Sequence, residues 1–295
     1  MATENISLWV QFLFSGLTAG SIYALIAVSL VIVYQTSLLI CFAQGEFFVI
    51  GALTMISLVA KGLPMALAFI LTVVLAAILG AAVERVLIRP IRNSGIGNLI
   101  VMTVAVSLTL RGSALVIWGK ESKVLPPFTS GNPLQVLGAT LQPQVLWIIC
   151  ITLISLLLIW FFFEKTTTGI AMRACAENRL GASLMGIGTN RVTILSWAWG
   201  AGIGAIAGMA VSPILFMQYG SGATPMVKGF IAMSIGGLAS ITGAVIAGYL
   251  LGIMEAYTIG VISSQYSDPI VFTLLIVVLI WKPQGLFGTT RAREI

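Results

Sequence analysis

The sequence has no histidine and few charged residues, so it has little that could cover a water-exposed surface. Charged residues make up 8% of the 295 residues, whereas hydrophobic residues make up 59%. Soluble domains contain about 25% charged residues, and a soluble fold of this composition would lack polar side chains for its surface. Each membrane-spanning helix needs about 20 apolar residues, so the length predicts a helical protein that crosses the membrane several times.

Residues for metal binding and for most enzyme chemistry are also scarce. The three cysteines, Cys41, Cys150 and Cys175, are scattered without the spacing of metal ligands. The sequence lacks the phosphate-binding pattern G-x-x-x-x-G-K-[ST]. The run Gly202-Ile-Gly-Ala-Ile-Ala207 matches a dinucleotide-binding pattern, but it lies in an apolar run with no preceding strand. We therefore expect no metal, no cofactor, no ATPase site and no enzyme activity.

Eight long apolar runs predict the membrane spans. The run at about 229–257 is too long for one crossing, and Gly236-Gly237 and Ile241-Thr-Gly243 predict a turn within it. The run at about 42–60 begins with the polar stretch Ala43-Gln-Gly-Glu46, so it either starts below the bilayer centre or is partly re-entrant. The predicted fold is all-α, a polytopic transmembrane bundle of about eight or nine helices forming a single domain over residues 1–295. The other runs lie at about 9–34, 64–83, 98–118, 144–163, 192–216 and 269–281.

Basic residues gather in three groups at the ends of apolar runs. This placement indicates the cytoplasmic side of a membrane rather than a nucleic-acid partner. The N-terminal part has no lysine or arginine before Lys61, so we predict an external N-terminus and a cytoplasmic C-terminus. That arrangement needs an odd number of crossings, and nine would satisfy it. The groups are Arg85, Arg89 and Arg92; Lys165, Arg173, Arg179 and Arg191; and Lys282, Arg291 and Arg293.

Glycines recur at four-residue intervals within the apolar runs. This spacing places small residues on one face of a helix, where two helices can pack closely in lipid. The predicted contact faces are Gly16 with Gly20, Gly200 with Gly204 and Gly208, and Gly248 with Gly252.

A few polar residues lie within or beside the apolar runs. Charges at membrane depth tend to face a cavity or a partner, so Gln44, Glu46 and Arg111 are candidates for the lining of a translocation pathway, and Glu46 can pair with Arg111. The alternative for Gln44 and Glu46 is a helix start at the membrane interface. Glu255 is a further carboxylate in an apolar run, and Asp268 is interpreted as a loop residue at a helix start.

The segment 164–191 is too polar to span the membrane. Thr166-Thr-Thr168 offers helix-capping oxygens, and Gly186 or Gly188 can end the helix, which predicts one helix of about 17 residues between them. One face carries small side chains, including Ala171, Ala174, Cys175, Asn178 and Ala182, and Arg173 and Glu177 lie on a neighbouring face. The segment can dock into another protein or lie on the bilayer surface, and docking is favoured. Either face can make the contact.

Six motifs in order along the chain resemble those of a known family. They are GLTAGSIYAL at 16–25, FAQGEFF at 42–48, MRACAEN at 172–178, LMGI at 184–187, IGGLASITGA at 235–244 and KPQGLFG at 282–288. Together they resemble branched-chain amino acid ABC transporter permeases of the LivH type, and the resemblance covers nearly the whole chain. Arg111 departs from the family pattern, in which we expect a neutral residue.

The resemblance implies an inner-membrane permease subunit of an ATP-binding-cassette importer, with no ATPase site of its own. Its implied partners are a second homologous permease, two cytoplasmic ABC ATPases, an external solute-binding protein and the lipid bilayer. The segment 164–191 corresponds to the coupling segment that contacts the ATPase, with Arg173, Glu177, Asn178 and Gly186 as its contact region. The family default substrates are branched-chain amino acids, taken up by alternating access.

Other functions remain open on the residues alone. Related permeases import urea, short amides or other neutral amino acids. A stand-alone secondary transporter would use Glu46 and Glu255 as ion sites and would show inverted repeats. No convincing repeat is visible. A membrane enzyme is disfavoured by the missing histidine and by the lack of a nucleophile motif.

Overall fold

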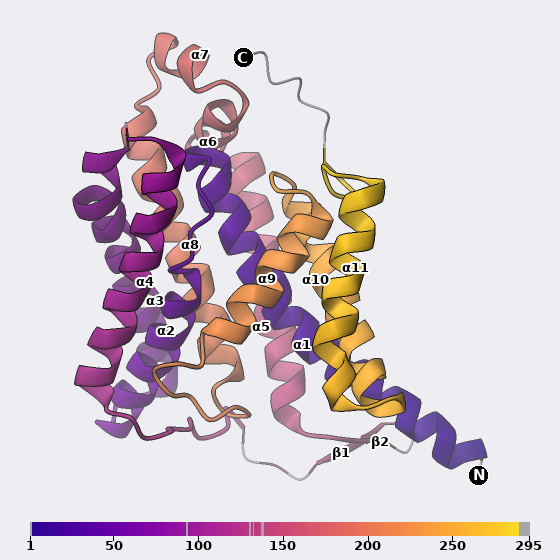
Figure 1. Cartoon of the computed structure of the whole chain (residues 1–295). Helices are drawn as coiled ribbons and strands as arrows, with labels where there is room; N and C mark the ends of the chain where they lie inside the picture. Colours follow the sequence, from indigo (N-terminus) through magenta and orange to yellow (C-terminus); the bar gives the residue numbers. More distant parts are fainter. Residues whose placement is uncertain (1, 93, 130, 132, 137–138, 289–295) are drawn as a thin grey trace.

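The computed structural model describes residues 2–92, 94–129, 131, 133–136 and 139–288, and these form a bundle of helices (Figure 1). The predicted all-α polytopic bundle is confirmed. A small antiparallel hairpin, β1 (Leu134–Val136) with β2 (Ala139–Leu141), is an addition to it. The helices are α1 (Ala2–Ser37), α2 (Gln44–Ala60), α3 (Met65–Val83), α4 (Ile96–Trp118), α5 (Pro143–Lys165), α6 (Thr167–Glu177), α7 (Arg179–Leu184), α8 (Thr189–Val211), α9 (Ala223–Gly236), α10 (Ile241–Val261) and α11 (Ser267–Trp281).

Seven helices in the described part of the chain are long and apolar enough to cross a membrane. One of them is α3, which continues through a π-helical turn, η1 (Glu84–Ile88), and a 3₁₀ turn, η2 (Arg89–Ile91). Another is α11, which reaches 18 residues together with the preceding 3₁₀ turn, η3 (Ser264–Tyr266). Helices α2 and α9, of 17 and 14 residues, are not among the seven and run along the bundle beside them. The protein is therefore a multi-pass membrane protein.

Helix α2 begins inside the bundle rather than at its end. The chain leaves α1 at Ser37, and residues 38–43 are not helical. Gln44, the first residue of α2, is buried and donates from its side-chain amide to the carbonyl oxygen of Gly200, midway along α8. The run predicted at 42–60 is thus a short helix that starts at depth, as its polar beginning indicated.

The long run 229–257 divides as predicted. Helix α9 ends at Gly236, and Gly237 adopts a φ of 109°, a conformation that only glycine takes up readily. Helix α10 starts at Ile241, where the Ser240 hydroxyl caps the amide of Gly243. After α11 the chain folds back onto this turn, because the Leu286 amide donates to the carbonyl oxygen of Ile235 at 2.7 Å.

Helices α1 and α10 pack closely along the predicted glycine faces. A Cβ atom on Gly16 would lie 2.6 Å from Cα of Ile253, and one on Gly248 would lie 2.6 Å from the Ala24 amide nitrogen. Such approaches allow no side chain larger than hydrogen, so the two backbones are in van der Waals contact. Gly200 and Gly208 of α8 serve similarly, with Gly208 against the Phe48 carbonyl group of α2, whereas Gly204 has only ordinary contact distances. Most of α1 is buried, and it runs diagonally through the bundle (Figure 1).

The two ends of the bundle carry different structures. Helices α6 and α7 and the last turn of α11 lie at one end, whereas the start of α1 and the β1–β2 hairpin lie at the other (Figure 1). The predicted orientation, with an external N-terminus and a cytoplasmic C-terminus, requires the start of α1 and the end of α11 to lie at opposite ends, as they do. Arg291 and Arg293, part of the third basic group, lie outside the described residues.

Candidate functional site

The segment between α5 and α8 forms two short helices at one end of the bundle. Thr166 caps α6 by accepting a hydrogen bond from the Gly169 amide at 3.0 Å, as predicted. The prediction of one helix of about 17 residues is wrong, because α6 ends at Glu177 and α7 begins at Arg179. Asn178 separates them: its extended backbone breaks the helix, and its side-chain oxygen accepts from the Gly181 amide at 2.8 Å.

Gly186 ends α7 as the sequence suggested. Its φ of 81° suits glycine. Its amide donates to the Ser183 carbonyl oxygen, and the Ile187 amide donates to that of Ala182. These two hydrogen bonds form a Schellman motif that stops the helix sharply. Gly186 is exposed, and a Cβ atom there would meet nothing within 4 Å.

The small-residue face of this segment packs against the bundle. Met172, Cys175 and Ala182 are buried and belong to the main hydrophobic core, and burial raises the pKa of the Cys175 thiol. The opposite side is open and apolar. This open side carries Leu180, Leu184 and Met185, whose exposed fractions are 72%, 79% and 85%. We call these three residues the α7 apolar face.

Two arginines of the segment have different surroundings. Arg173, half-buried on α6, forms an ion pair with Glu164 at the end of α5, 2.8 Å away. Arg179, the first residue of α7, donates to the Thr36 carbonyl oxygen of α1 at 3.0 Å and to the Thr193 hydroxyl of α8 at 3.4 Å. From the sequence, Arg179 served only to predict the cytoplasmic side of the membrane. No neighbouring residue indicates that its side chain reaches α1 and α8.

Glu46 and Arg111 form the predicted pair. The Arg111 guanidinium donates from two nitrogens to Glu46 Oε1, at 2.7 and 3.1 Å, and Ser107 donates to the same oxygen. Glu46 is buried, whereas the Arg111 side chain is one-third exposed. Glu46 Oε2 and Gln44 Oε1 are buried acceptors with no partner among the described residues.

A larger ionic network joins four helices. Lys228 of α9 pairs with the buried Glu255 of α10, and it also lies 3.2 Å from Asp268 in the first turn of α11. Glu255 accepts further hydrogen bonds from Tyr23 of α1 at 2.7 Å and from Ser267 at 3.1 Å. Sequence reasoning noted Glu255 and Asp268 but missed Lys228, because a lysine at the edge of an apolar run also fits a membrane interface.

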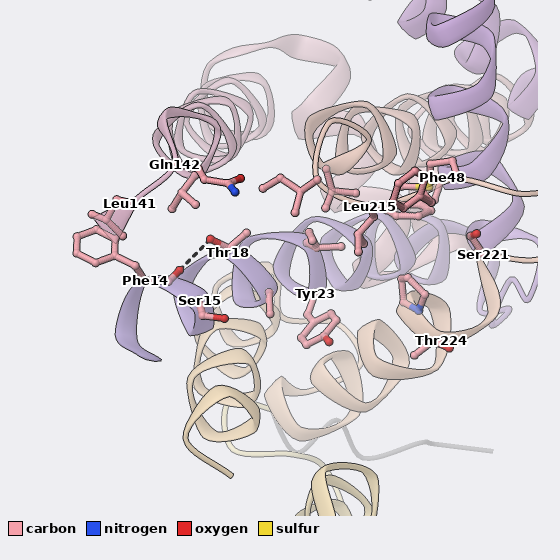
Figure 2. Close-up of a pocket in the computed structure, with 18 of the residues that line it drawn as sticks. Phe14, Ser15, Thr18, Tyr23, Phe48, Leu141, Gln142, Leu215, Ser221 and Thr224 are labelled. Atoms are coloured by element: carbon pink, nitrogen blue, oxygen red, sulfur yellow. Dashed lines mark hydrogen bonds between the residues drawn. The ribbon is translucent and has the colours of Figure 1, made fainter. Parts of the chain in front are cut away.

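A cavity of about 650 Å³ opens near the end of the bundle opposite to α7 (Figure 2). Its walls come from α1, α2, β2, the start of α5, the end of α8, the segment between α8 and α9, and the start of α9. None of its described lining residues is charged. Its polar lining residues are Gln11, Ser15, Thr18, Tyr23, Thr140, Gln142, Ser221 and Thr224, and the remaining lining residues are apolar.

Comparisons with known proteins agree with this architecture. The family described as "Branched-chain amino acid transport system / permease component" matches residues 12–279. The chain belongs to this permease family. It is 33% identical to the high-affinity branched-chain amino acid transport permease LivH of Escherichia coli, over 99% of this chain and all of the relative. It is 31% identical to BraD of Pseudomonas aeruginosa, another such permease, over 97% of this chain and 98% of the relative.

The cavity of this permease does not include the pathway residues predicted from sequence. Gln44, Glu46 and Arg111 are not among its lining residues. Their part in translocation stays a prediction, as does the coupling role of Arg173, Glu177, Asn178 and Gly186. The cavity itself had no sequence signal, since its lining residues are spread between positions 11 and 225.

Proposed function

We propose that this permease is the membrane subunit of an ATP-binding-cassette importer for branched-chain or other neutral, hydrophobic amino acids. It would form the translocation pathway with a second, homologous permease. Two ABC ATPases would bind on the cytoplasmic side, and an external solute-binding protein would deliver the substrate. The α6–α7 end would then face the cytoplasm, and the cavity end would face outward.

The α7 apolar face is the observation that carries this proposal. Leu180, Leu184 and Met185 are exposed on a short, doubly capped helix that lies outside the membrane-spanning helices. Isolated exposed apolar residues are ordinary, but three on one short turn are typical of a protein contact. Basic residues at the same end, including Arg179 and Arg191, support a cytoplasmic location for it, because the positive-inside rule associates such residues with the cytoplasm.

The structure suggests how a partner at α7 would act on the membrane helices. The small-residue face already packs against the bundle. The α7 apolar face, with the exposed Glu177 and Asn178 beside it, therefore remains for contact with the ATPase. Arg179 connects α7 to the end of α1 and the start of α8. A shift of α7 on ATP binding would therefore act on the two most buried long helices and switch the permease pair between its two states.

Co-purification of the ATPase subunits with Leu184→Glu tests the proposal. A charge in the centre of the α7 apolar face should reduce the recovered ATPase at least about tenfold, because a buried unpaired carboxylate weakens an interface strongly. Val124→Glu is the matched control, since Val124 is an exposed apolar residue in the segment after α4, away from α7. Equal ATPase recovery with Leu184→Glu and with the unaltered permease would contradict docking at this face.

A further inference from the structure

The end of α3 carries two exposed arginines, Arg85 in η1 and Arg89 in η2. Neither forms an ion pair or a side-chain hydrogen bond with another residue that the structure describes. By contrast, Arg92 and Arg173 at the same end donate to side chains of neighbouring helices. We propose that Arg85 and Arg89 bind the phosphate of an anionic phospholipid.

The length of α3 places the two arginines at the level of the lipid headgroups. The helix and its terminal turns cover Met65–Ile91, and α3 starts just after the exposed turn at Lys61. At about 1.5 Å per residue, Arg85 lies about 30 Å and Arg89 about 36 Å from the start of α3. The hydrocarbon core of a bilayer is about 30 Å thick, and the headgroups extend it to about 40 to 45 Å. With the start of α3 at one boundary of the core, Arg85 lies at the other boundary and Arg89 among the phosphates.

The exposed side of α3 leads directly to these arginines. Only 28% of its apolar span is buried, compared with 83% of that of α1. Exposed apolar side chains recur at intervals of four, which places them in one stripe along the helix. Arg85 directly precedes the last residue of this stripe, and Arg89 lies three positions after it, on the same face. A lipid whose acyl chain lies along the stripe would therefore bring its phosphate to both arginines. The stripe consists of Ile70, Val74, Ile78, Ala82 and Val86.

The spacing and the charge of the two arginines suit a phosphate. Residues four positions apart are neighbours on a helix surface, with about 5 to 6 Å between their Cβ atoms. Each guanidinium group can donate two parallel hydrogen bonds to phosphate oxygens. Between positions 84 and 92 the sequence has three arginines but one carboxylate, Glu84, which is buried. The positive charge is therefore in excess, and an anionic headgroup compensates it, whereas a zwitterionic headgroup brings a cation of its own.

A lipid bound here would also affect the contact between α3 and α8. Arg92 follows directly after η2 and donates to Asn190 Oδ1, in the first turn of α8, at 2.9 Å. A lipid that holds Arg85 and Arg89 would therefore fix the end of α3 beside α8. This site does not depend on which solute the permease transports, so its test stands apart from that of the proposed function.

Lipid retention by the purified permease tests the site. After washing in detergent, the permease should retain phosphatidylglycerol about tenfold better than phosphatidylcholine, as measured by native mass spectrometry. Arg85→Gln combined with Arg89→Gln should abolish this preference. Lys165→Gln combined with Lys282→Gln is the matched control, because it removes two exposed charges at the same end but none on α3. The control should keep the preference within about twofold. Equal losses in the two double variants would overturn the site, since any surface charge would then suffice.

Two further measurements separate a lipid from other anions and from effects on folding. Excess inorganic phosphate should not displace phosphatidylglycerol, because free phosphate lacks acyl chains for the stripe on α3. Displacement would assign the arginines to a free anion and would overturn the lipid site. Phosphatidylglycerol should also raise the unfolding temperature of the unaltered permease and of the control, but not that of the glutamine variant. An equal rise in all three would overturn the site.

A charge-preserving variant keeps the test valid if the glutamine variant does not fold. Arg85→Lys combined with Arg89→Lys retains both charges but cannot donate paired hydrogen bonds from one group. Its preference for phosphatidylglycerol should fall several-fold and remain above that of the glutamine variant. Retention equal to that of the unaltered permease would show that paired hydrogen bonds do not hold the phosphate, and would overturn the geometry proposed here.

Discussion

The two ends of the bundle differ in shape and in chemistry. At one end, α7 presents three exposed apolar side chains, and Arg179 connects the helix to the bundle. At the other end, hydroxyls, amides and aliphatic groups line a concave space. Clustered exposed apolar residues suit a protein partner, and a cavity with a mixed lining suits a small molecule. The α7 apolar face and the uncharged cavity thus lie at opposite ends of the bundle.

One helix connects these two ends. Helix α1 contributes Phe14, Thr18 and Tyr23 to the cavity wall, and its Thr36 carbonyl accepts from Arg179 at the opposite end. Between these points α1 packs against α10 through glycines. The seam along α1 therefore has no room for added volume, whereas α7 meets α1 and α8 through side-chain hydrogen bonds of Arg179.

The largest expected effect is at the rigid seam. Gly252→Leu places a side chain against the Gly16 and Gly20 backbone, where a Cβ atom alone would already overlap. The cost should exceed about 3 kcal/mol, since neither backbone can move away, and little folded protein should be recovered in detergent. Gly112→Leu is the control, because a Cβ atom at Gly112 meets nothing within 4 Å. Similar thermal unfolding of both variants would show that the seam is not rigid.

The ionic network behind the cavity comes next. Lys228→Met leaves Glu255 buried without its cation and should destabilise the protein by about 3 to 5 kcal/mol. The double variant Lys228→Met with Glu255→Gln should recover most of this loss, since no buried charge is then unpaired. Thermal unfolding in detergent measures the loss in the single variant and the recovery in the double variant. No recovery in the double variant would mean that Lys228 acts through packing rather than charge.

A smaller effect on stability is expected where α7 meets the bundle. Arg179→Gln removes the donors to Thr36 and Thr193, at a cost of about 1 to 2 kcal/mol. ATPase recovery should be unaffected, but the solute transported per ATP hydrolysed should fall several-fold, because the link from α7 to α1 is lost. An unchanged transport-to-hydrolysis ratio would show that α1 receives no signal through Arg179.

The smallest effect is expected at Arg173. Its ion pair with Glu164 is partly exposed on both sides, and such pairs contribute about 0 to 1 kcal/mol. Arg173→Ala should therefore leave the unfolding temperature nearly unchanged. If the same variant lost ATPase recovery as strongly as Leu184→Glu, the contact surface would extend from α7 onto α6.

Much of the fold could be predicted from local patterns. The turn near Gly237 and the cap at Thr166 follow from the residue types that such positions require. The Glu46–Arg111 pair was predictable because charges within apolar runs need partners. The helix break at Asn178 was not predictable, because asparagine at that position also fits the i, i+3, i+4 spacing of a helix face. Its capping role depends on where the chain turns next.

The sites at the two ends depended on tertiary packing and were less predictable. The small-residue face of 164–191 was a candidate for docking, but only the packed structure shows it turned inward with Cys175 buried. The cavity combines residues from α1 with others more than 190 positions away, such as Leu215. Lys228 was missed because its partners Glu255 and Asp268 lie on two other helices.

ATP-driven uptake by reconstituted vesicles tests the central claim most directly. The account predicts leucine uptake only when this permease is combined with its partner permease, the two ATPases, the binding protein and ATP. It predicts no uptake by the permease alone across any ion gradient. Robust uptake by the permease alone without ATP would contradict the account and would favour a secondary transporter with Glu46 and Glu255 as ion sites.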